Sequence, residues 1–367
     1  MTTSNKKPFS YIAPGAPKVV KGGGVANLDL PILNLSTNES SFGASPLAVE
    51  AIKDRAAQPN RYPDPSSTDL RKAIGEAFDL DPDLITCGNG SEEVIDGIAR
   101  VYARPGDEIL FSEYGFLQFP ILCWRTGATP VKAAGDGLKT DVSNILAAVT
   151  DKTKLVLVAN PDNPTGTYIP ASEMKRLRDD LPSHIVLVVD SAYCEYVDDP
   201  AFTDGLELVA GHDNVIVTRT FSKAWGLAGL RVGWGYGPAE MIGALNLMRG
   251  IGNVNAMAQA GAVAALKDPD HVDMVRTKTD EARNKFEADL KQFGVVAVPG
   301  AANFVLVKFP TEDTNRRAID AHRHLAAENI YVRSNEDYGL DDYLRITVGT
   351  IEECDRVIES LQRFFAD

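Results

Sequence analysis

The 367-residue sequence lacks the features that mark membrane-spanning, secreted and metal-bridged proteins. No apolar run approaches the roughly 18 residues that cross a bilayer, and residues 1–10 are polar where a signal peptide has an apolar core. The four cysteines are far apart and form no C-x-x-C pair, which argues against a disulfide framework or a zinc site. We therefore expect buried thiols in a reducing compartment and a cytoplasmic protein.

Basic residues and histidines are also scarce. The chain has 37 Lys and Arg against 51 Asp and Glu, a formal net charge of −14. Such a surface repels nucleic acids and acidic membranes, so neither is expected as a partner. An anionic ligand must instead meet a local group of arginines. The five histidines are scattered, and we expect no catalytic histidine and no bound metal.

The regular features of the chain predict an α/β fold. Between residues 84 and 234, short apolar strands alternate with helices, and 155–159 and 185–190 are apolar almost throughout. This pattern is typical of a mostly parallel sheet sandwiched by helices. After about residue 250 a long helix is followed by short strands and further helices. We predict a large domain over 43–249 and a smaller α+β domain formed by 250–367 with an N-terminal arm, 1–42.

Lys223 lies in the stretch Arg219–Gly233, directly after the predicted strand 215–217. A lysine crowded by small residues on a tight turn suits covalent capture of a carbonyl, because desolvation or a cationic neighbour lowers the pKa of the amine. The stretch taken alone also allows an ordinary surface lysine.

Several residues near Lys223 or at predicted helix starts could bind an anion. Gly88-Asn89-Gly90-Ser91 opens a helix whose free N–H groups suit a phosphate. Thr220 and Ser222 offer hydroxyl donors, and Arg231 follows a turn that can fold back toward the lysine. A guanidinium is well matched to phosphate. Together they predict a clamp for the anionic tail of a cofactor.

Four other residues could contact a heteroaromatic ring. Asp190 ends a buried strand and needs a cationic partner, such as a pyridinium nitrogen, unless it caps a helix. Asn163 and Tyr193 could bond a ring hydroxyl. Tyr114 could lie on the ring or be a packed core aromatic. In parallel sheets ligands collect at the carboxyl ends of the strands, where these residues are predicted to lie.

These motifs, in this order, resemble those of a known family. Asn163-Pro164-Thr165-Gly166, Asp190-x-x-Tyr193, Thr220-x-Ser222-Lys223 and Arg231 are similar to the motif set of fold-type I pyridoxal-phosphate aminotransferases of the aspartate aminotransferase superfamily. The likeness covers roughly residues 30 to 350. Within that superfamily the chain resembles the histidinol-phosphate aminotransferase group, on the segments Tyr11–Gly15, Asn38-Glu39, Asn60–Asp64, Ser222–Arg231, Ala302–Phe304 and Leu344–Thr350.

The resemblance implies pyridoxal 5'-phosphate as cofactor and gives each residue a role. Lys223 would hold the cofactor and then act as the general base. Asp190 would keep the ring nitrogen protonated, Asn163 and Tyr193 would contact the ring oxygen, and Tyr114 would stack on the ring. The remaining cofactor residues would hold the phosphate; they are Ser91, the Glu92 backbone, Thr220, Ser222, Arg231 and Tyr62 from a neighbouring subunit. Such sharing implies a homodimer with shared active sites.

For the substrate side, the resemblance implies an amino donor and a 2-oxo acid acceptor. Arg333 and Arg345 would grip the phosphate of L-histidinol phosphate, with Tyr11 of the partner chain and Asn38 nearby. Two converging arginines suit a dianion, whereas one suffices for a carboxylate. The implied reaction, a step of histidine biosynthesis, passes the amino group to 2-oxoglutarate and gives imidazole-acetol phosphate and glutamate.

One segment departs from the group's pattern. The chain reads Arg249-Gly250-Ile251-Gly252-Asn253-Val254 where the group often has Arg-Gly-Pro-Phe-Asn-Val. The difference leaves an aromatic amino-acid aminotransferase of the same branch open as an alternative. More distant alternatives are a decarboxylase on the same fold and a non-enzymatic ligand-sensing module, which elsewhere carries a basic DNA-binding domain.

Overall fold

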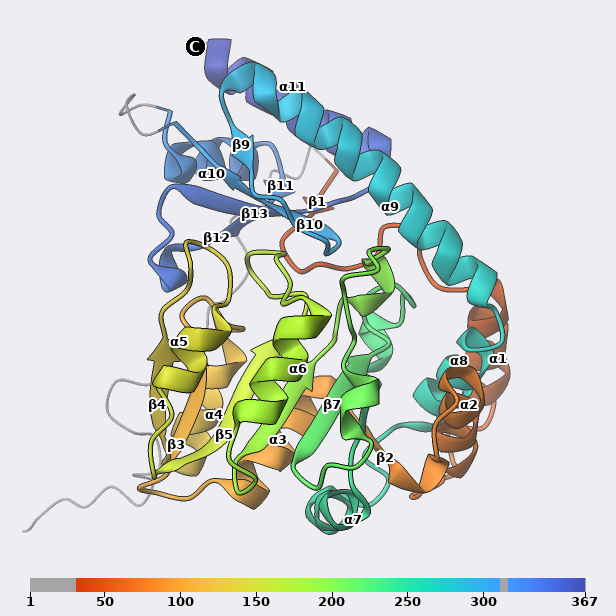
Figure 1. Cartoon of the computed structure of the whole chain (residues 1–367). Helices are drawn as coiled ribbons and strands as arrows, with labels where there is room; N and C mark the ends of the chain where they lie inside the picture. The colour runs from red at the N-terminus through yellow and green to blue at the C-terminus, as the bar shows by residue number, and fades with distance from the viewer. Residues whose placement is uncertain (1–30, 311–315, 367) are drawn as a thin grey trace, which may run out of the picture.

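A computed structural model describes residues 31–310 and 316–366, so the predicted substrate residue Tyr11 lies outside the described residues. Two lobes are evident, a larger one around a seven-stranded sheet and a smaller one above it (Figure 1). The strand order in the large sheet is β2-β8-β7-β6-β5-β3-β4. All neighbouring strands are parallel except β8, which runs antiparallel to both β2 and β7. The predicted mostly parallel sheet is therefore confirmed.

The strands of the large sheet are short and largely buried. They are β2 (Ile85–Gly88), β3 (Glu108–Ser112), β4 (Thr129–Ala133), β5 (Thr153–Ala159), β6 (Val186–Asp190), β7 (Val215–Thr220) and β8 (Gly233–Tyr236). Every residue of β6 and β7 is buried, as expected for central strands covered on both faces.

Helices cover both faces of this sheet. One face packs against α3 (Ser91–Tyr102), α4 (Gln118–Thr126) and α7 (Ala239–Met248). The other face packs against α5 (Val142–Ala147) and α6 (Ala171–Asp180). Apolar side chains of the helices and strands form the two cores, so the predicted sandwich is confirmed.

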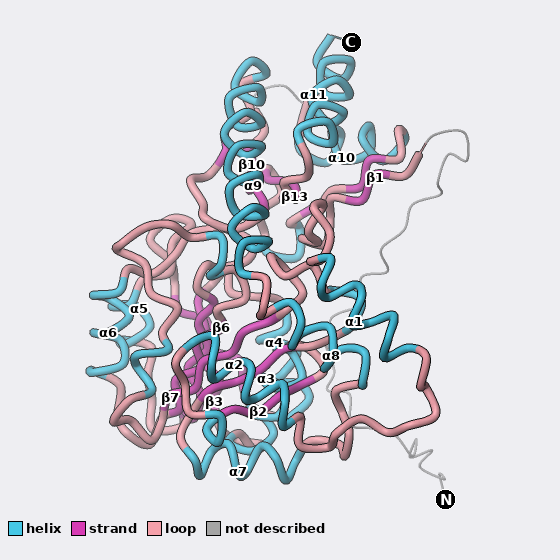
Figure 2. The backbone as a smooth tube through the Cα atoms, turned by 90° about the vertical axis from the view of Figure 1, so that its right-hand side faces the viewer, coloured by secondary structure: helices cyan, strands magenta, loops and turns pink. Residues whose placement is uncertain are grey.

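A third helical group lies beside the β2 edge. It consists of α1 (Pro46–Ala56), α2 (Thr68–Phe78) and α8 (Ala256–Ala265), and Figure 2 shows α1 and α8 side by side. α8 is built mainly of alanine and glycine, and a Cβ added at Gly261 would lie 2.8 Å from a side-chain carbon of Ile52. The small residues therefore let α1 and α8 approach closely.

In the part of the chain that the structure describes, the smaller lobe contains two sheets and three α-helices. A four-stranded antiparallel sheet has the order β12-β13-β10-β9, and β1 pairs in parallel with β11. The strands are β1 (Leu33–Asn34), β9 (Val296–Ala297), β10 (Phe304–Lys308), β11 (Ile330–Tyr331), β12 (Arg333–Ser334) and β13 (Tyr343–Thr347). The helices are α9 (Pro269–Leu290), α10 (Ala318–Ala327) and α11 (Ile351–Ala366).

The division between the lobes is better placed later in the chain than residue 249. Val254, Val272 and Val275 belong to the core beneath α1, α2 and α8. Ala282 and Phe286, farther along α9, belong to the core of the smaller lobe. We therefore propose a division inside α9. Leu33 and Leu35 pack in the smaller lobe's core.

The long helix predicted after about residue 250 is present as α9. The four cysteines are free and buried, as expected from their spacing. Within residues 31–310 and 316–366, no helix is both long and apolar enough to cross a membrane.

Candidate active site

The polar side chains of the predicted site come from the carboxyl ends of the large sheet. Asp190 is the last residue of β6 and Thr220 the last of β7, while Gly88 ends β2. Parallel strands end at one edge of the sheet, so residues distant in sequence meet there. The smaller lobe faces this edge and contributes Arg345.

Lys223 lies in the loop after β7, beneath the segment 36–39. Its Nζ donates to the backbone oxygens of Thr37 at 3.2 Å and Asn38 at 3.1 Å, and lies 5.6 Å from the centre of the Tyr193 ring. Burial lowers the pKa of Lys223 to about 8, and the positive charge of Arg345 acts in the same direction. A larger fraction of the amine is therefore neutral and nucleophilic near neutral pH than in an exposed lysine.

Asp190 is buried at the end of β6. Its carboxylate accepts a hydrogen bond from Thr218 Oγ1 at 2.9 Å. Burial raises the pKa of Asp190 to about 6, while the Thr218 hydrogen bond and the charge of Lys223 oppose that rise. Above this pH the group is a buried anion, which a cation bound at the same place would stabilise.

Tyr193 and Asn163 are linked beside Lys223. The Tyr193 hydroxyl accepts from Asn38 Nδ2 at 3.0 Å and from Asn163 Nδ2 at 3.3 Å. The Tyr193 ring packs edge-on against Phe304 with centroids 5.3 Å apart. Asn38 thus belongs to the same group of side chains, together with the backbone oxygen that binds Lys223.

The residues predicted to clamp an anion lie together. Arg231 Nη1 donates to Ser222 Oγ at 3.2 Å, and Thr220 Oγ1 donates to the same oxygen at 3.0 Å. A Cβ added at Gly90 would lie 2.6 Å from Arg231 Nη2, and Gly90 has φ +89°, so glycine suits this position twice over. Gly90 precedes Ser91 and Glu92 at the start of α3, whose free N–H groups complete the clamp.

Glu93 and Asn253 support the clamp and were missed in the sequence. The Glu93 carboxylate accepts from the backbone N–H of Asn89 and from Asn253 Nδ2 at 2.8 Å. Asn253 Nδ2 also reaches the Cys87 oxygen at 3.1 Å. Glutamate as the third residue of a helix often bonds the preceding turn, so this position carried a signal for Glu93. The departing segment 249–254 is therefore attached to the clamp.

Arg333 and Arg345 lie directly opposite each other on β12 and β13. Residues so paired in an antiparallel sheet project on the same face. Arg345 is buried, donates to Asn163 Oδ1 and, at 2.6 Å, to the Ser36 oxygen, and lies over Phe304. Arg333 is more exposed and pairs with Asp337 at 2.6 Å.

Two site residues around Asn163 were not predicted. Asp162 is buried, its carboxylate accepts from the Asn163 N–H at 2.9 Å, and burial raises its pKa to about 8. Tyr338, from the smaller lobe, donates its hydroxyl to the Asn163 oxygen at 3.2 Å. Asp162 stood beside a predicted site residue, whereas nothing in the sequence pointed to Tyr338.

The predicted residues Tyr62 and Tyr114 differ in where they lie. Tyr62 is 98% exposed on the loop before α2. Tyr114 follows β3 and lines a small crevice together with Asp162, next to Asn163. Tyr114 is thus at the correct edge of the sheet, while Tyr62 points away from the described part of its own chain.

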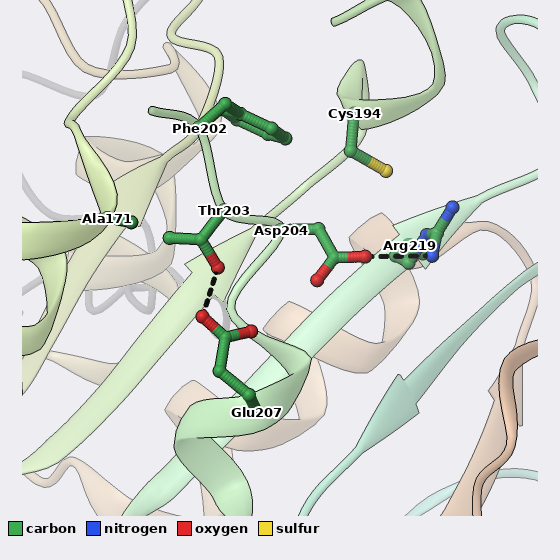
Figure 3. A pocket seen from close by; sticks show the side chains of 7 residues that line it. All are labelled: Ala171, Cys194, Phe202, Thr203, Asp204, Glu207 and Arg219. Carbon is green, nitrogen blue, oxygen red and sulfur yellow. Dashed lines mark hydrogen bonds and ion pairs between the residues drawn. The ribbon is translucent and has the colours of Figure 1, made fainter. Parts of the chain in front are cut away.

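A separate pocket lies beside Arg219 (Figure 3), with a volume of about 360 Å³. Side chains alternate along β7, so Arg219 projects opposite to Thr218 and Thr220, which face the candidate site. Arg219 pairs with Asp204 at 3.1 Å and with Glu195 at 2.7 Å, and Thr203 donates to Glu207 at 2.5 Å. The charged groups of this pocket are paired with one another, although the buried Arg219 Nε has no hydrogen-bond partner, and we assign no ligand to the pocket.

The fold and the site define a protein with a buried lysine of lowered pKa, a buried carboxylate and a group of hydroxyls with an arginine at one edge of an α/β sheet. Residues 31–361 match the model of the family "Aminotransferase class I and II". The chain belongs to this family and is an aminotransferase.

Curated relatives and solved structures agree with this assignment. A histidinol-phosphate aminotransferase of Rhodopseudomonas palustris strain HaA2 is 46% identical over 91% of this chain and 92% of that protein. One from Paramagnetospirillum magneticum is 46% identical over 91% and 92%. The structure of histidinol-phosphate aminotransferase from Sinorhizobium meliloti with pyridoxal-5'-phosphate has a TM-score of 0.87 at 29% identity, covering 91% of each chain.

Proposed function

We propose that this aminotransferase transfers the amino group of L-histidinol phosphate to 2-oxoglutarate, with pyridoxal 5'-phosphate as cofactor. The observation that carries the substrate assignment is the register of Arg333 opposite Arg345, which puts two cations on one face of the sheet, with Arg345 close enough to Lys223 to lower its pKa. Relatives that bear the name histidinol-phosphate aminotransferase, at 46% identity over nearly the whole chain, support it.

The residues present fit this cofactor. A phosphate matches the clamp of Ser91, Thr220, Ser222 and Arg231, where hydroxyls, a guanidinium and a helix N-terminus converge. A protonated ring nitrogen matches buried Asp190, which would otherwise be an unpaired anion. Bound pyridoxal phosphate supplies a ring that withdraws electrons from the substrate's α-carbon.

The protein's own groups then move protons and position the substrate. Lys223 Nζ, held by two backbone oxygens, would take the proton from the α-carbon and pass it on as the general base. Its lowered pKa favours the neutral amine that this step requires. Asn163 and Tyr193 hydrogen-bond beside it and would orient the ring oxygen.

A dianion suits the arginine pair better than a single carboxylate does. Each guanidinium can form two parallel hydrogen bonds, and a phosphate offers three oxygens to share between them. Arg345 is held by Asn163 and Ser36, so one half of the phosphate site is preorganised. This arrangement favours histidinol phosphate over substrates that carry one carboxylate.

A second copy of the chain would complete the site. Tyr62, Leu247, Met248 and Ile251 are large apolar side chains that are 98%, 88%, 53% and 95% exposed. The loop that carries Tyr62 lies against the segment that carries Ile251, since a Cβ at Gly252 would lie 3.3 Å from Pro63. Apolar patches of this kind mark interaction surfaces. We propose a homodimer in which Tyr62 reaches the partner's phosphate clamp; a cytoplasmic location remains a prediction.

An aromatic amino-acid aminotransferase is the second candidate, favoured by the departure at Ile251-Gly252 beside the clamp. A substrate panel separates the two. We expect kcat/KM for L-histidinol phosphate, with 2-oxoglutarate as acceptor, to exceed that for phenylalanine and tyrosine by at least about tenfold. If phenylalanine or tyrosine is clearly the better donor, the substrate assignment is wrong and the aminotransferase assignment stands.

A further inference from the structure

Asp337 forms an ion pair with Arg333, the arginine that would also bind the phosphate of the proposed substrate. Its carboxylate lies 2.6 Å from Arg333 Nη2, four residues earlier in the chain. The Arg333 side chain is 22% exposed and that of Asp337 46%, so solvent and ligands can reach the pair. Arg345 on the neighbouring strand instead donates to a neutral amide and a backbone oxygen. Arg333 is therefore the arginine of the pair whose charge an internal anion neutralises.

The turn that carries Asp337 is fixed to the site. Asp337 belongs to the short turn Glu336–Tyr338, and the next residue, Tyr338, donates its hydroxyl to the Asn163 oxygen. Asn335 Nδ2 donates to the Tyr343 oxygen at 3.3 Å on the other side of the turn. These contacts keep the carboxylate beside Arg333 when the ion pair opens.

We propose that Asp337 is a built-in competitor for the anion that Arg333 binds, and that it sets how tightly the arginine pair holds phosphate. The inference rests on the proposed function, in which Arg333 receives the phosphate. The substrate must displace Asp337 from Arg333, and the displaced carboxylate then repels the bound dianion. The repulsion acts equally on substrate and product, since both carry the phosphate. Asp337 thus acts through Arg333: it weakens the binding of substrate and product to the same extent and so favours product release.

The charge of the ligand gives the inference a signature. Coulomb energy is proportional to ligand charge, so removing the Asp337 charge strengthens the binding of a dianion more than that of a monoanion. The Arg333–Asp337 pair is partly exposed, which limits the gain. For Asp337→Asn we expect the Kd of inorganic phosphate at pH 8 to fall about three- to fivefold. The Kd of acetate should fall less than about twofold.

The test is a calorimetric titration of the cofactor-loaded protein with inorganic phosphate and with acetate at constant ionic strength. The variants are Asp337→Asn, Asp337→Glu, which should restore the wild-type Kd, and Glu336→Gln as a control that removes a neighbouring charge. Glu336 is an exposed acid of the same turn. In an Arg333→Ala background, Asp337→Asn should give no further gain, because the competition acts through Arg333.

Three outcomes overturn the inference. The first is an unchanged phosphate Kd in Asp337→Asn. The second is a higher phosphate Kd in that variant, which would mean that Asp337 only orients Arg333. The third is an equal fall in the phosphate Kd when Asp337→Asn is made in the Arg333→Ala background. Steady-state kinetics of Asp337→Asn distinguish the two roles of Asp337. If it competes for Arg333, KM for histidinol phosphate should fall together with the phosphate Kd, whereas a merely structural role would raise KM. The titration needs no turnover, so failure of the histidinol-phosphate assignment in the substrate panel and failure of the Asp337 role are separate results.

Discussion

In the larger lobe the candidate site is built where buried strands end, and in the smaller lobe it is built on a short edge strand and a turn. Asp190 and Thr220 are buried residues at the ends of β6 and β7, where the backbone fixes them. Arg333 lies on the two-residue strand β12, Tyr338 lies in the turn that follows it, and both are partly exposed. The residues proposed to bind the cofactor are therefore held by buried strands, whereas Tyr338, on the proposed substrate side, is held by a contact between the lobes.

Arg345 stands between the two regions. It is buried in the smaller lobe, yet it bonds Asn163 of the larger lobe and Ser36 of the arm. Changes on the cofactor side should stop the chemistry, and changes on the substrate side should mainly alter affinity. The substitutions below, in order of decreasing effect, distinguish the two sides of the site.

Replacing Lys223 by Ala should lower kcat at least about 10⁴-fold, since it removes both the covalent attachment point and the general base. The visible absorption band of a lysine–cofactor Schiff base, and its linkage reducible by borohydride, should disappear. Lys175→Ala, at an exposed lysine on α6, is the control and should behave as the wild type. A Lys223→Ala protein that turns over normally would contradict the proposed chemistry.

Replacing Arg345 by Ala should reduce kcat/KM for histidinol phosphate about 100- to 1,000-fold, because a buried cation with several partners is lost. The loss should appear mostly in KM, with the cofactor band retained. Arg363→Ala, at an exposed arginine of α11, controls for net charge. A loss confined to kcat would place Arg345 on the cofactor side of the comparison.

Replacing Asp190 by Asn should stabilise the cofactor-free protein at pH 8 by up to about 3 kcal/mol, since the folded-state pKa of Asp190, about 6, exceeds its ordinary value of 3.8. The folded state binds the extra proton, so stability falls as pH rises through that window and the penalty persists above pH 6. The gain in Asp190→Asn should vanish toward pH 4.

Urea unfolding at both pH values measures this difference. Asp199→Asn is the matched control. Hydrogen bonds lower the pKa of the exposed Asp199, so removing this carboxylate should not raise the free energy of unfolding. With cofactor bound, Asp190→Asn should instead weaken cofactor retention, which dialysis followed by absorbance reports. If the cofactor-free wild type and Asp190→Asn have the same free energy of unfolding at pH 8, the buried charge of Asp190 does not destabilise the fold.

Replacing Tyr338 by Phe removes one hydrogen bond between the lobes, to the Asn163 oxygen. We expect KM for the amino donor to rise about two- to tenfold with a small change in kcat, the usual value of one such bond. Tyr168→Phe, which loses an exposed hydroxyl contact to Asp199, is the control. A large fall in kcat would mean that Tyr338 acts on the chemistry itself.

The same contrast explains how far the sequence could be read. Continuous apolar strands predicted the large sheet, and the residues that follow each strand end predicted Asp190, Asn163 and Lys223, because parallel strands end at one edge. Helix α8 was missed since alanine and glycine give no periodic pattern of large apolar residues. The antiparallel direction of β8 within the mostly parallel sheet depends on pairing that local sequence does not encode.

Residues of the site that depend on contacts between distant segments could not be found without the structure. Tyr338 and Asn163 are 175 positions apart, and Arg345 and Asn163 are 182 apart. Arg345 was predicted only through the family resemblance, and Tyr338 has no local signal. The pairing of Asp337 with Arg333 was equally invisible, because spacing of four residues is common in any charged segment.

The measurement that tests the account most directly is the ratio of kcat/KM for L-histidinol phosphate to that for L-phenylalanine, in the wild type and in Arg333→Ala. We predict a wild-type ratio of at least about ten and a fall of at least about tenfold in the variant, with the cofactor band unchanged. A wild-type ratio below one, or a ratio that Arg333→Ala leaves unchanged, would contradict the assignment of the arginine pair to the substrate phosphate.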